Sequence, residues 1–237
     1  MPLLRSYLQG WDVRTSRRVH HFLANSQHVA KRIERHYGRQ ATVIHPPVDS
    51  ARFAPAQEVE DYYLVVSALV PYKRVDLAVR ACSRLGRRLK VVGTGPELKV
   101  LKALAGPSVE FLGWRPDAAL PGLYARARAL IFTGEEDFGI TPLESMASGR
   151  PVLAFGQGGA LETVVPPGDP QGRAATGLFF HEQSLPALAA SVRLIPSWST
   201  VGVLLARLAS GVGPADELWD RTRMTSWRTL SRFTPRD

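Results

Sequence analysis

Short apolar runs alternate with longer amphipathic stretches through the middle of this 237-residue chain. The apolar runs are strand-length and rich in β-branched or aromatic residues, as in strands buried on both faces of a parallel sheet. They occupy residues 62–67, 89–92, 109–112, 130–133 and 152–155. Helical patterns lie between them, at residues 75–85, 97–104, 121–127 and 142–148. This alternation predicts right-handed βαβ units and an α/β fold with a doubly wound, mostly parallel sheet.

Weaker patterns flank the alternating region. Asn25 and Ser26 offer a helix N-cap, the apolar positions that follow have helical spacing, and Gly38 is a suitable helix end. A short strand is expected at residues 42–44, and a last helix begins near Ser184.

These patterns divide the chain into three segments. Residues 1–24 contain aromatic and basic residues without a clean period. Residues 25–194 are expected to form one folded domain. Residues 195–237 are polar, Arg-rich and aperiodic, which predicts a loosely ordered tail.

The net charge of +9 is concentrated at the two ends of the chain. Residues 1–40 carry eight Lys or Arg against two acids, and residues 193–237 carry seven against four. Residues 41–192 hold fifteen of each sign. Because the basic excess lies outside the clearest folding pattern and lacks interleaved base-stacking aromatics, we expect no nucleic-acid binding. A basic flank can still attract an anionic membrane surface.

Targeting segments and cysteine content limit the class of protein. No apolar run approaches the roughly 20 residues of a bilayer-spanning helix, and the N-terminus does not read as a signal peptide. We therefore expect a cytoplasmic protein, with peripheral contact at the inner face of the membrane left open. The single cysteine, Cys82, excludes an internal disulfide and a cysteine-based zinc cluster. Its helical surroundings predict a buried small side chain.

Four loops follow the predicted strands at the sheet edge where ligands of doubly wound folds bind. The first contains Lys73 and Arg74 directly before a helix, where the helix dipole disfavours positive charge. A bound anion at the same helix N-terminus would offset this unfavourable placement of two cations. The pattern therefore favours a phosphate site. The alternative is a solvated basic turn.

Glycines dominate two of the other loops. Gly93 and Gly95 separate a strand from a helix, and paired glycines permit close backbone approach to a ligand. Such turns are also common for purely structural reasons, and the dinucleotide fingerprint is incomplete here. Residues 156–162 contain three more glycines after a strand and allow the same two interpretations, ligand approach or a tight crossover.

The most distinctive loop places three consecutive acids, residues 135–137, after a buried strand. Pro142 suits the first turn of the helix that follows, and Thr141 is the expected N-cap. With Thr141 as the N-cap, Glu144 lies in the first helical turn.

Glu136 and Glu144 would then flank one crevice, with the N–H groups of Gly139 and Ile140 between them. Carboxylates accept hydrogen bonds from sugar hydroxyls, and bare amides at a helix start bind phosphate. The alternative is that Glu144 complements the helix dipole and the remaining acids form a solvated turn. The whole cluster favours the binding site.

Six motifs follow one another in order along the chain. They are Ala24-Asn25-Ser26, residues 44–49 (Ile-His-Pro-Pro-Val-Asp) with Phe53, Pro71-Tyr72-Lys73-Arg74, residues 92–97, Phe111-Leu112-Gly113-Trp114, and residues 136–144 with 146–152. Together they resemble the carboxyl-terminal domain of the family 4 retaining glycosyltransferases, over roughly residues 20–183. The resemblance implies the Rossmann-like C-terminal half of a GT-B enzyme, most like bacterial mannosyltransferases of surface-polysaccharide assembly.

The resemblance also implies roles for individual residues. Lys73 and Glu136 would be the catalytic pair, Lys73 on the donor diphosphate and Glu136 on hydroxyls of the transferred sugar. Glu144 would bind the ribose hydroxyls. The other implied donor-binding residues are Arg74, Gly93, Gly95, Gly113, Trp114, Phe138, Gly139 and Ile140.

No cofactor and no metal is implied, because protein cations and helix amides would stabilise charge on the departing diphosphate. The donor would be a nucleoside-diphosphate sugar, with GDP-mannose favoured. A hexose, mannose favoured, would pass with retention to a glycan or lipid-linked acceptor.

Two departures from the family pattern change this prediction. Many relatives carry an arginine five residues before the lysine, where this chain has Ala68. We also expect the N-terminal acceptor domain to be missing, because residues 1–24 resemble only its last helix and linker. We expect a chain that holds a donor and lacks turnover alone. A frameshift would produce a tail like residues 195–237.

Two other functions are compatible with the pattern. The chain could be a non-catalytic nucleotide-sugar-binding subunit that completes a split transferase. An epimerase or phosphorylase of similar fold is a further alternative. The pairing of Glu136 with Glu144, followed by Gly149-Arg150-Pro151, argues against that last class.

Overall fold

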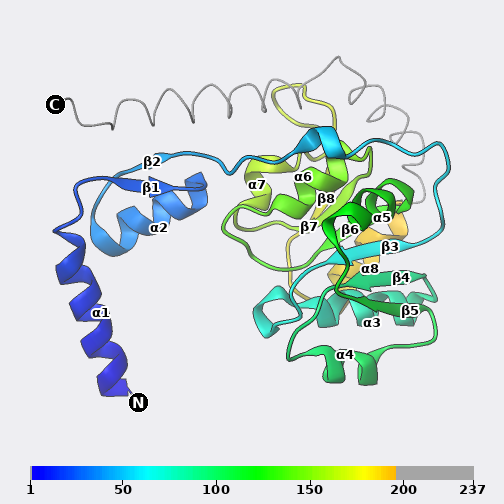
Figure 1. The fold of residues 1–237 in the computed structure, drawn as a ribbon, viewed down its shortest axis with the longest axis horizontal. Coiled ribbons are helices and arrows are strands. Elements are labelled where there is room, and N and C mark those ends of the chain that lie inside the picture. Colours follow the sequence, from blue (N-terminus) through cyan, green and yellow to red (C-terminus); the bar gives the residue numbers. More distant parts are fainter. Residues whose placement is uncertain (1, 196–237) are drawn as a thin grey trace. The chain divides into compact units, whose positions relative to one another are not determined.

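The computed structural model describes residues 2–195, which fall into two compact units that divide after residue 47 (Figure 1). The predicted tail lies outside the described residues apart from Ile195. Within residues 2–195, no helix is both long and apolar enough to cross a membrane.

The first unit is a small α/β arrangement. Its elements are α1 (Pro2–Ser16), β1 (Phe22–Ala24), α2 (Gln27–Tyr37) and β2 (Ala41–Val43). The predicted caps of α2 are confirmed, because Ser26 Oγ accepts a hydrogen bond from the Val29 amide at 3.0 Å and Gly38 has a φ of +62°. The strands β1 and β2 pair in parallel, which places α2 with the N-terminal segment. This division differs from the predicted boundary after residue 24.

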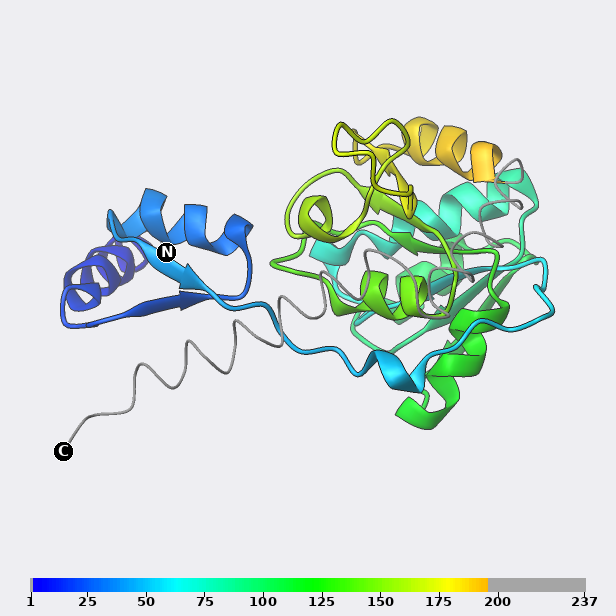
Figure 2. The same cartoon turned by 90° about the horizontal axis from the view of Figure 1, so that it is seen from above.

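The second unit is built on a six-stranded parallel sheet (Figures 1 and 2). Its strands are β3 (Tyr63–Val66), β4 (Leu89–Val92), β5 (Val109–Gly113), β6 (Ala129–Phe132), β7 (Val152–Phe155) and β8 (Gly177–Phe180), in the spatial order β5-β4-β3-β6-β7-β8. All five predicted strands are confirmed, with ends shifted by a residue or less. The edge strand β8 was not predicted from the sequence.

Helices cover both faces of this sheet (Figure 1). On one face lie α3 (Val75–Leu85), α4 (Leu98–Leu104) and α8 (Leu185–Leu194), with α8 against α3 (Figure 2). On the other lie α5 (Leu120–Arg126), α6 (Ile140–Ala147) and α7 (Ala160–Thr163). Short 3₁₀ turns are η1 (Ser50–Arg52), η2 (Pro71–Lys73) and η3 (Asp117–Ala119).

Strand alternation divides the hydrophobic core into two layers. In β3, Tyr63 and Val65 join the layer under α3 and α8, whereas Leu64 joins the layer under α5 and α7. Cys82 of α3 is fully buried in the first layer, and burial raises the pKa of its thiol to about 12. The prediction that Cys82 is a small packing residue is confirmed.

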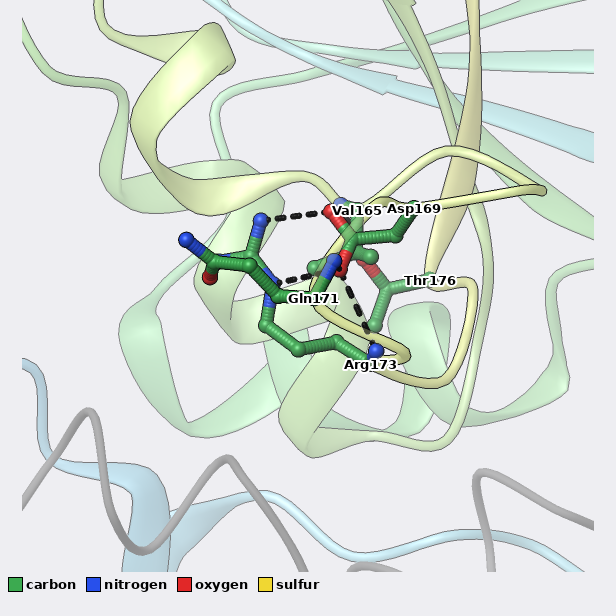
Figure 3. Close-up of polar contacts among 5 residues, drawn as sticks. All are labelled: Val165, Asp169, Gln171, Arg173 and Thr176. Atoms are coloured by element: carbon green, nitrogen blue, oxygen red, sulfur yellow. Dashed lines mark hydrogen bonds and ion pairs between the residues drawn. The ribbon is translucent and has the colours of Figure 1, made fainter.

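The connection from α7 to β8 is held by a polar network (Figure 3). Its two ends are joined where Thr176 Oγ1 accepts a hydrogen bond from the Val165 amide at 2.8 Å. Inside the loop, the Asp169 carboxylate accepts hydrogen bonds from the Gln171 amide and from the amide and guanidinium of Arg173. The loop is therefore ordered by its own side chains.

The Asp169 network should weaken in acid. Hydrogen bonds from the Arg173 side chain are the main reason that the pKa of Asp169 falls to about 2. A lowered pKa means that the ionised carboxylate stabilises the loop above about pH 4, and that this contribution is lost as the pH falls towards 2. Hydrogen-exchange protection of the Gln171 and Arg173 amides should fall over that range.

The matched variant is Asp169→Asn, in which the same amides should already exchange faster at pH 7. The Thr176 amide, which bonds to the Val165 carbonyl, serves as the internal control and should keep its protection. Equal protection of the two loop amides in both proteins would show that the carboxylate does not order the loop.

Candidate functional site

The strand order reverses between β3 and β6, which makes their carboxyl ends the topological switch point of the sheet. Hydrogen-bonded pairing between them stops at Leu64 and Leu130, although both strands continue for two more residues. On its other side β3 stays paired with β4 through Val66. The loops after β3 and β6 thus leave the sheet where neighbouring strands have separated, the usual place for a ligand in such folds.

Lys73 and Glu136 meet at this switch point. Lys73 ends η2 in the loop after β3, and Glu136 lies in the acidic loop after β6. The Lys73 ammonium and the Glu136 carboxylate form an ion pair. The two charges predicted to act on one ligand are therefore neighbours.

Backbone contacts fix these two loops against each other. Thr133 Oγ1 donates a hydrogen bond to the Lys73 carbonyl at 2.7 Å, and Gln183 Nε2 donates one to the Thr133 carbonyl at 3.0 Å. A Cβ at Gly134 would lie 3.1 Å from the Lys73 Cα, so only glycine fits without displacing the lysine. Neither Thr133 nor Gln183 was predicted as a site residue, and the only sequence signal was that Thr133 is a polar residue at the end of an apolar strand.

The glycine-rich loop after β7 supports the acidic loop from behind. The Gly159 amide donates a hydrogen bond to the Glu136 carbonyl at 2.8 Å. A Cβ at Gly158 would lie 2.4 Å from that carbonyl oxygen, and one at Gly159 would lie 2.3 Å from the Phe138 Cα. These glycines are required by backbone packing, which supports the tight-crossover interpretation of this loop.

Gly93 and Gly95 also pack against backbone. A Cβ at Gly93 would lie 1.9 Å from the Ser67 carbonyl oxygen, and one at Gly95 would lie 2.3 Å from the Leu69 carbonyl oxygen. The Leu69 amide in turn bonds to the Thr94 carbonyl at 2.9 Å. The loop after β4 therefore holds the loop that leads to Lys73, a role that explains both glycines without a ligand.

The start of α6 corrects two expectations. The N-cap is Gly139, with a φ of +87°, and the helix begins at Ile140. Thr141 is therefore not the N-cap, and Glu144 lies beyond the first turn. The physical reason is that Gly139 alone adopts the required positive φ next to the Phe132 ring, which a Cβ would approach to 2.9 Å. The amides of Gly139 and Ile140 do stand at the helix start, as expected.

Glu144 is held by a tyrosine that the sequence did not reveal. The hydroxyl of Tyr124, a fully buried residue of α5, donates a hydrogen bond to Glu144 Oε2 at 2.7 Å. Burial raises the pKa of Glu144, and the hydrogen bond from Tyr124 opposes that rise. One carboxylate oxygen is thus oriented by the protein, and the other remains to accept a ligand hydroxyl.

The Glu144→Gln variant should be more stable than the wild type at pH 7. A raised pKa means that the folded state favours protonated Glu144, so stability is greatest below the unfolded pKa of about 4.5 and decreases as the pH rises through the folded pKa. Glutamine keeps an oxygen acceptor for Tyr124 and carries no charge. Thermal unfolding of both proteins at pH 7 and pH 4 should show a gain at pH 7 that shrinks at pH 4. A lower melting temperature for the variant at pH 7 would contradict this assignment.

Arg74 is occupied within its own helix. Its Nε donates to Asp76 Oδ1 at 3.0 Å. Arg74 has a φ of +52°, a left-handed conformation that costs a residue with a Cβ about 1 kcal/mol. It is the only non-glycine residue with positive φ within residues 2–195. Its guanidinium therefore has a carboxylate partner in the first turn of α3.

The remaining predicted residues are dispersed. Phe138 is buried, at 5% exposure, so its ring packs inside the protein. Trp114 is 69% exposed and follows Gly113, whose φ of +69° turns the chain at the end of β5. Ile140 is 43% exposed at the start of α6. The arrangement joins one cation, one carboxylate and a helix N-terminus, a combination suited to a ligand with both an anionic and a hydroxylated part.

Comparison with known proteins identifies several relatives. A family model described as "Glycosyl transferases group 1" matches residues 49–197. The GDP-mannose-dependent alpha-(1-6)-phosphatidylinositol monomannoside mannosyltransferase of Mycolicibacterium smegmatis is 32% identical, over 86% of this chain and 58% of its own length. The D-inositol 3-phosphate glycosyltransferase of Kribbella flavida is 28% identical, over 88% of this chain and 56% of its own length. The chain thus spans little more than half the length of these relatives.

Solved structures share the fold. HepE from Anabaena, solved in complex with UDP and glucose, superimposes with a TM-score of 0.71 at 21% identity, covering 92% of this chain and 66% of its own. TarM from S. aureus superimposes with a TM-score of 0.78 at 14% identity, covering 96% of this chain and 46% of its own. At these identities the likeness concerns the fold, and it confirms the predicted α/β class.

Proposed function

Because this chain belongs to the group 1 glycosyl transferases, we propose that it binds a nucleoside-diphosphate sugar and supplies the donor half of a hexosyl transfer with retention. GDP-mannose is the favoured donor, since the M. smegmatis relative carries the name of a GDP-mannose-dependent mannosyltransferase. The observation that carries the proposal is the Lys73–Glu136 pair at the switch point of the sheet.

Each part of the donor has a partner of suitable chemistry. The diphosphate would bind Lys73 and the amides of Gly139 and Ile140 at the start of α6, where the helix dipole favours negative charge. Hydroxyls of the sugar would donate to Glu136, and those of the ribose to the free oxygen of Glu144. Because Ala68 is uncharged and Arg74 is bonded to Asp76, Lys73 is the main cation available to the diphosphate.

Stabilising charge on the leaving nucleoside diphosphate is the chemical contribution that these groups can make. Thr133 holds the Lys73 backbone, and the α6 amides stand at an already formed helix start, so donor binding requires side-chain rotation rather than movement of the loops. No metal or cofactor is required by this proposal.

Isothermal titration calorimetry with GDP, UDP and ADP and with their sugars tests the donor assignment. We expect at least one of these nucleotides to bind, and its sugar form to bind with higher affinity. Absence of heat with all of them, for a protein shown by circular dichroism to be folded, would refute the donor site.

The acceptor side would come from further polypeptide, and the first unit offers a surface for it. Residues of α1 at helical spacing expose an apolar stripe, namely Leu4, Tyr7, Leu8 and Trp11, each more than half exposed. A stripe of this kind is normally covered by another protein surface. We infer that this stripe contacts an acceptor-binding domain. Glycan or lipid-linked acceptors would bind to that domain.

The same stripe favours the second candidate function, a non-catalytic nucleotide-sugar-binding subunit of a split transferase. The two are distinguished by activity once an acceptor-domain polypeptide co-purifies with this chain. A fall in kcat at saturating donor in Lys73→Met of the assembled complex would assign catalysis to this chain. A rise confined to the KM for the donor would make it a binding subunit.

A further inference from the structure

The two side chains proposed to hold the donor are joined to each other in this structure. Lys73 Nζ and Glu136 Oε1 form an ion pair whose side chains are only 18% and 17% exposed. Water therefore screens the pair less than it screens a surface pair. Within the part of the chain that the structure describes, each residue forms its only ion pair with the other.

The backbones behind these side chains are fixed. The Lys73 carbonyl accepts from Thr133 Oγ1, and the Glu136 carbonyl accepts from the Gly159 amide. The pair can therefore open by side-chain rotation without movement of either loop. The Tyr72 ring, whose centroid lies 5.1 Å from Lys73 Nζ, gives the ammonium a second favourable contact as it turns.

A diphosphate and the Glu136 carboxylate must compete for the same ammonium. If a bare nucleoside diphosphate takes Lys73, Glu136 is left as a poorly solvated carboxylate without a cation and close to phosphate. Leaving one partner of such a pair uncompensated is strongly unfavourable. A nucleotide sugar differs because its hydroxyls can donate to Glu136 and replace the lost ammonium.

Resting on the proposed function, we propose that Glu136 competes with the diphosphate for Lys73, so that the site holds a nucleotide sugar in preference to the nucleoside diphosphate left after transfer. While the sugar is attached, its hydroxyls satisfy Glu136. Once the sugar has gone, Glu136 takes Lys73 back and the nucleoside diphosphate is released. The ion pair thereby sets donor specificity and promotes product release.

Calorimetric titration of the full chain and its Glu136→Gln variant tests this inference, with GDP against GDP-mannose and UDP against UDP-glucose. Glutamine keeps the shape of the side chain and cannot neutralise Lys73. We expect the variant to bind the bare nucleoside diphosphate about tenfold more tightly. Its preference for the nucleotide sugar should fall by about tenfold or more, because a neutral amide is a weaker acceptor.

A double-variant cycle separates competition for Lys73 from simple charge repulsion. Both Glu136→Gln and the wild-type residue are compared in the Lys73→Met background. Competition predicts that the gain in nucleoside-diphosphate affinity is clearly larger when Lys73 is present. A gain that is equal or larger in the Lys73→Met background would show plain repulsion and overturn the inference.

Glu135→Gln is the matched control, because it removes one negative charge from the same loop and leaves the pair intact. It should change nucleoside-diphosphate affinity by about twofold or less. An effect as large as that of Glu136→Gln would overturn the inference, as would unchanged affinity and selectivity in Glu136→Gln. Failure of the wild type to bind GDP, UDP, ADP or any of their sugars would instead refute the proposed function, and the inference with it.

Discussion

Replacing Lys73 with methionine is expected to weaken binding of the nucleoside-diphosphate donor about 100-fold. Removing one partner of a poorly solvated charge interaction typically has an effect of this size in binding. The effect is large because Ala68 provides no second cation and Arg74 is engaged with Asp76. Calorimetric titration of both proteins with the nucleotide that binds the wild type most tightly measures it.

Arg74→Met is the matched control for this prediction. Both variants lose one positive charge from the same turn, and only Lys73 forms the pair at the switch point. We expect Arg74→Met to weaken binding about threefold or less, through long-range charge alone. Equal losses in the two variants would show that the turn attracts phosphate as a diffuse basic surface.

Gly159→Ala is expected to destabilise the folded protein by about 3 kcal/mol. The added Cβ would lie 2.3 Å from the Phe138 Cα and 2.6 Å from the carbonyl oxygens of Asp137 and Phe138. All three are backbone atoms, so relief requires the acidic loop to move and breaks the bond from the Gly159 amide to Glu136. For a domain of this size the melting temperature should fall by roughly 6–12 °C in a thermal unfolding experiment.

Gly122→Ala is the same substitution at another site, and we expect it to raise the stability of the folded protein instead of lowering it. Gly122 lies in α5, and a Cβ there would meet no atom within 4 Å. Alanine should stabilise the helix by about 0.5–1 kcal/mol. If Gly159→Ala were also neutral or stabilising, the close packing of the glycine-rich loop against the acidic loop would be wrong.

The elements of the second unit were largely readable from the sequence. The strands have continuous apolar runs, and the helices α3 and α5 have amphipathic spacing, because each element must bury a defined face. The strand β8 and the helix α7 escaped prediction. α7 has only four residues, and β8 has an apolar run of only three residues after Gly177, so neither is long enough for a clear pattern. For α1 (Pro2–Ser16), a helix was implied only by the family resemblance and not by a clean period in residues 1–24.

The residues of the candidate site were easier to predict from the sequence than the contacts that position them. Lys73, Glu136 and the start of α6 have strong local signals, namely cations and acids directly after strands and glycine before a helix. Tyr124 lies 20 residues from its partner Glu144, and Gln183 lies 50 residues from its partner Thr133. Nothing in the local sequence of either residue indicates those partners.

The α/β class, the strand-end loops and the kinds of charge that they carry follow from the sequence alone, because periodicity and residue type are local properties. The reversal of strand order between β3 and β6, which brings Lys73 next to Glu136, became visible in the folded chain. The folded chain also shows that Arg74 turns to Asp76 and that the glycines at 158 and 159 pack against backbone. These facts depend on which strands are neighbours, and strand order is set by the packing of helices on both faces of the sheet rather than by any one segment.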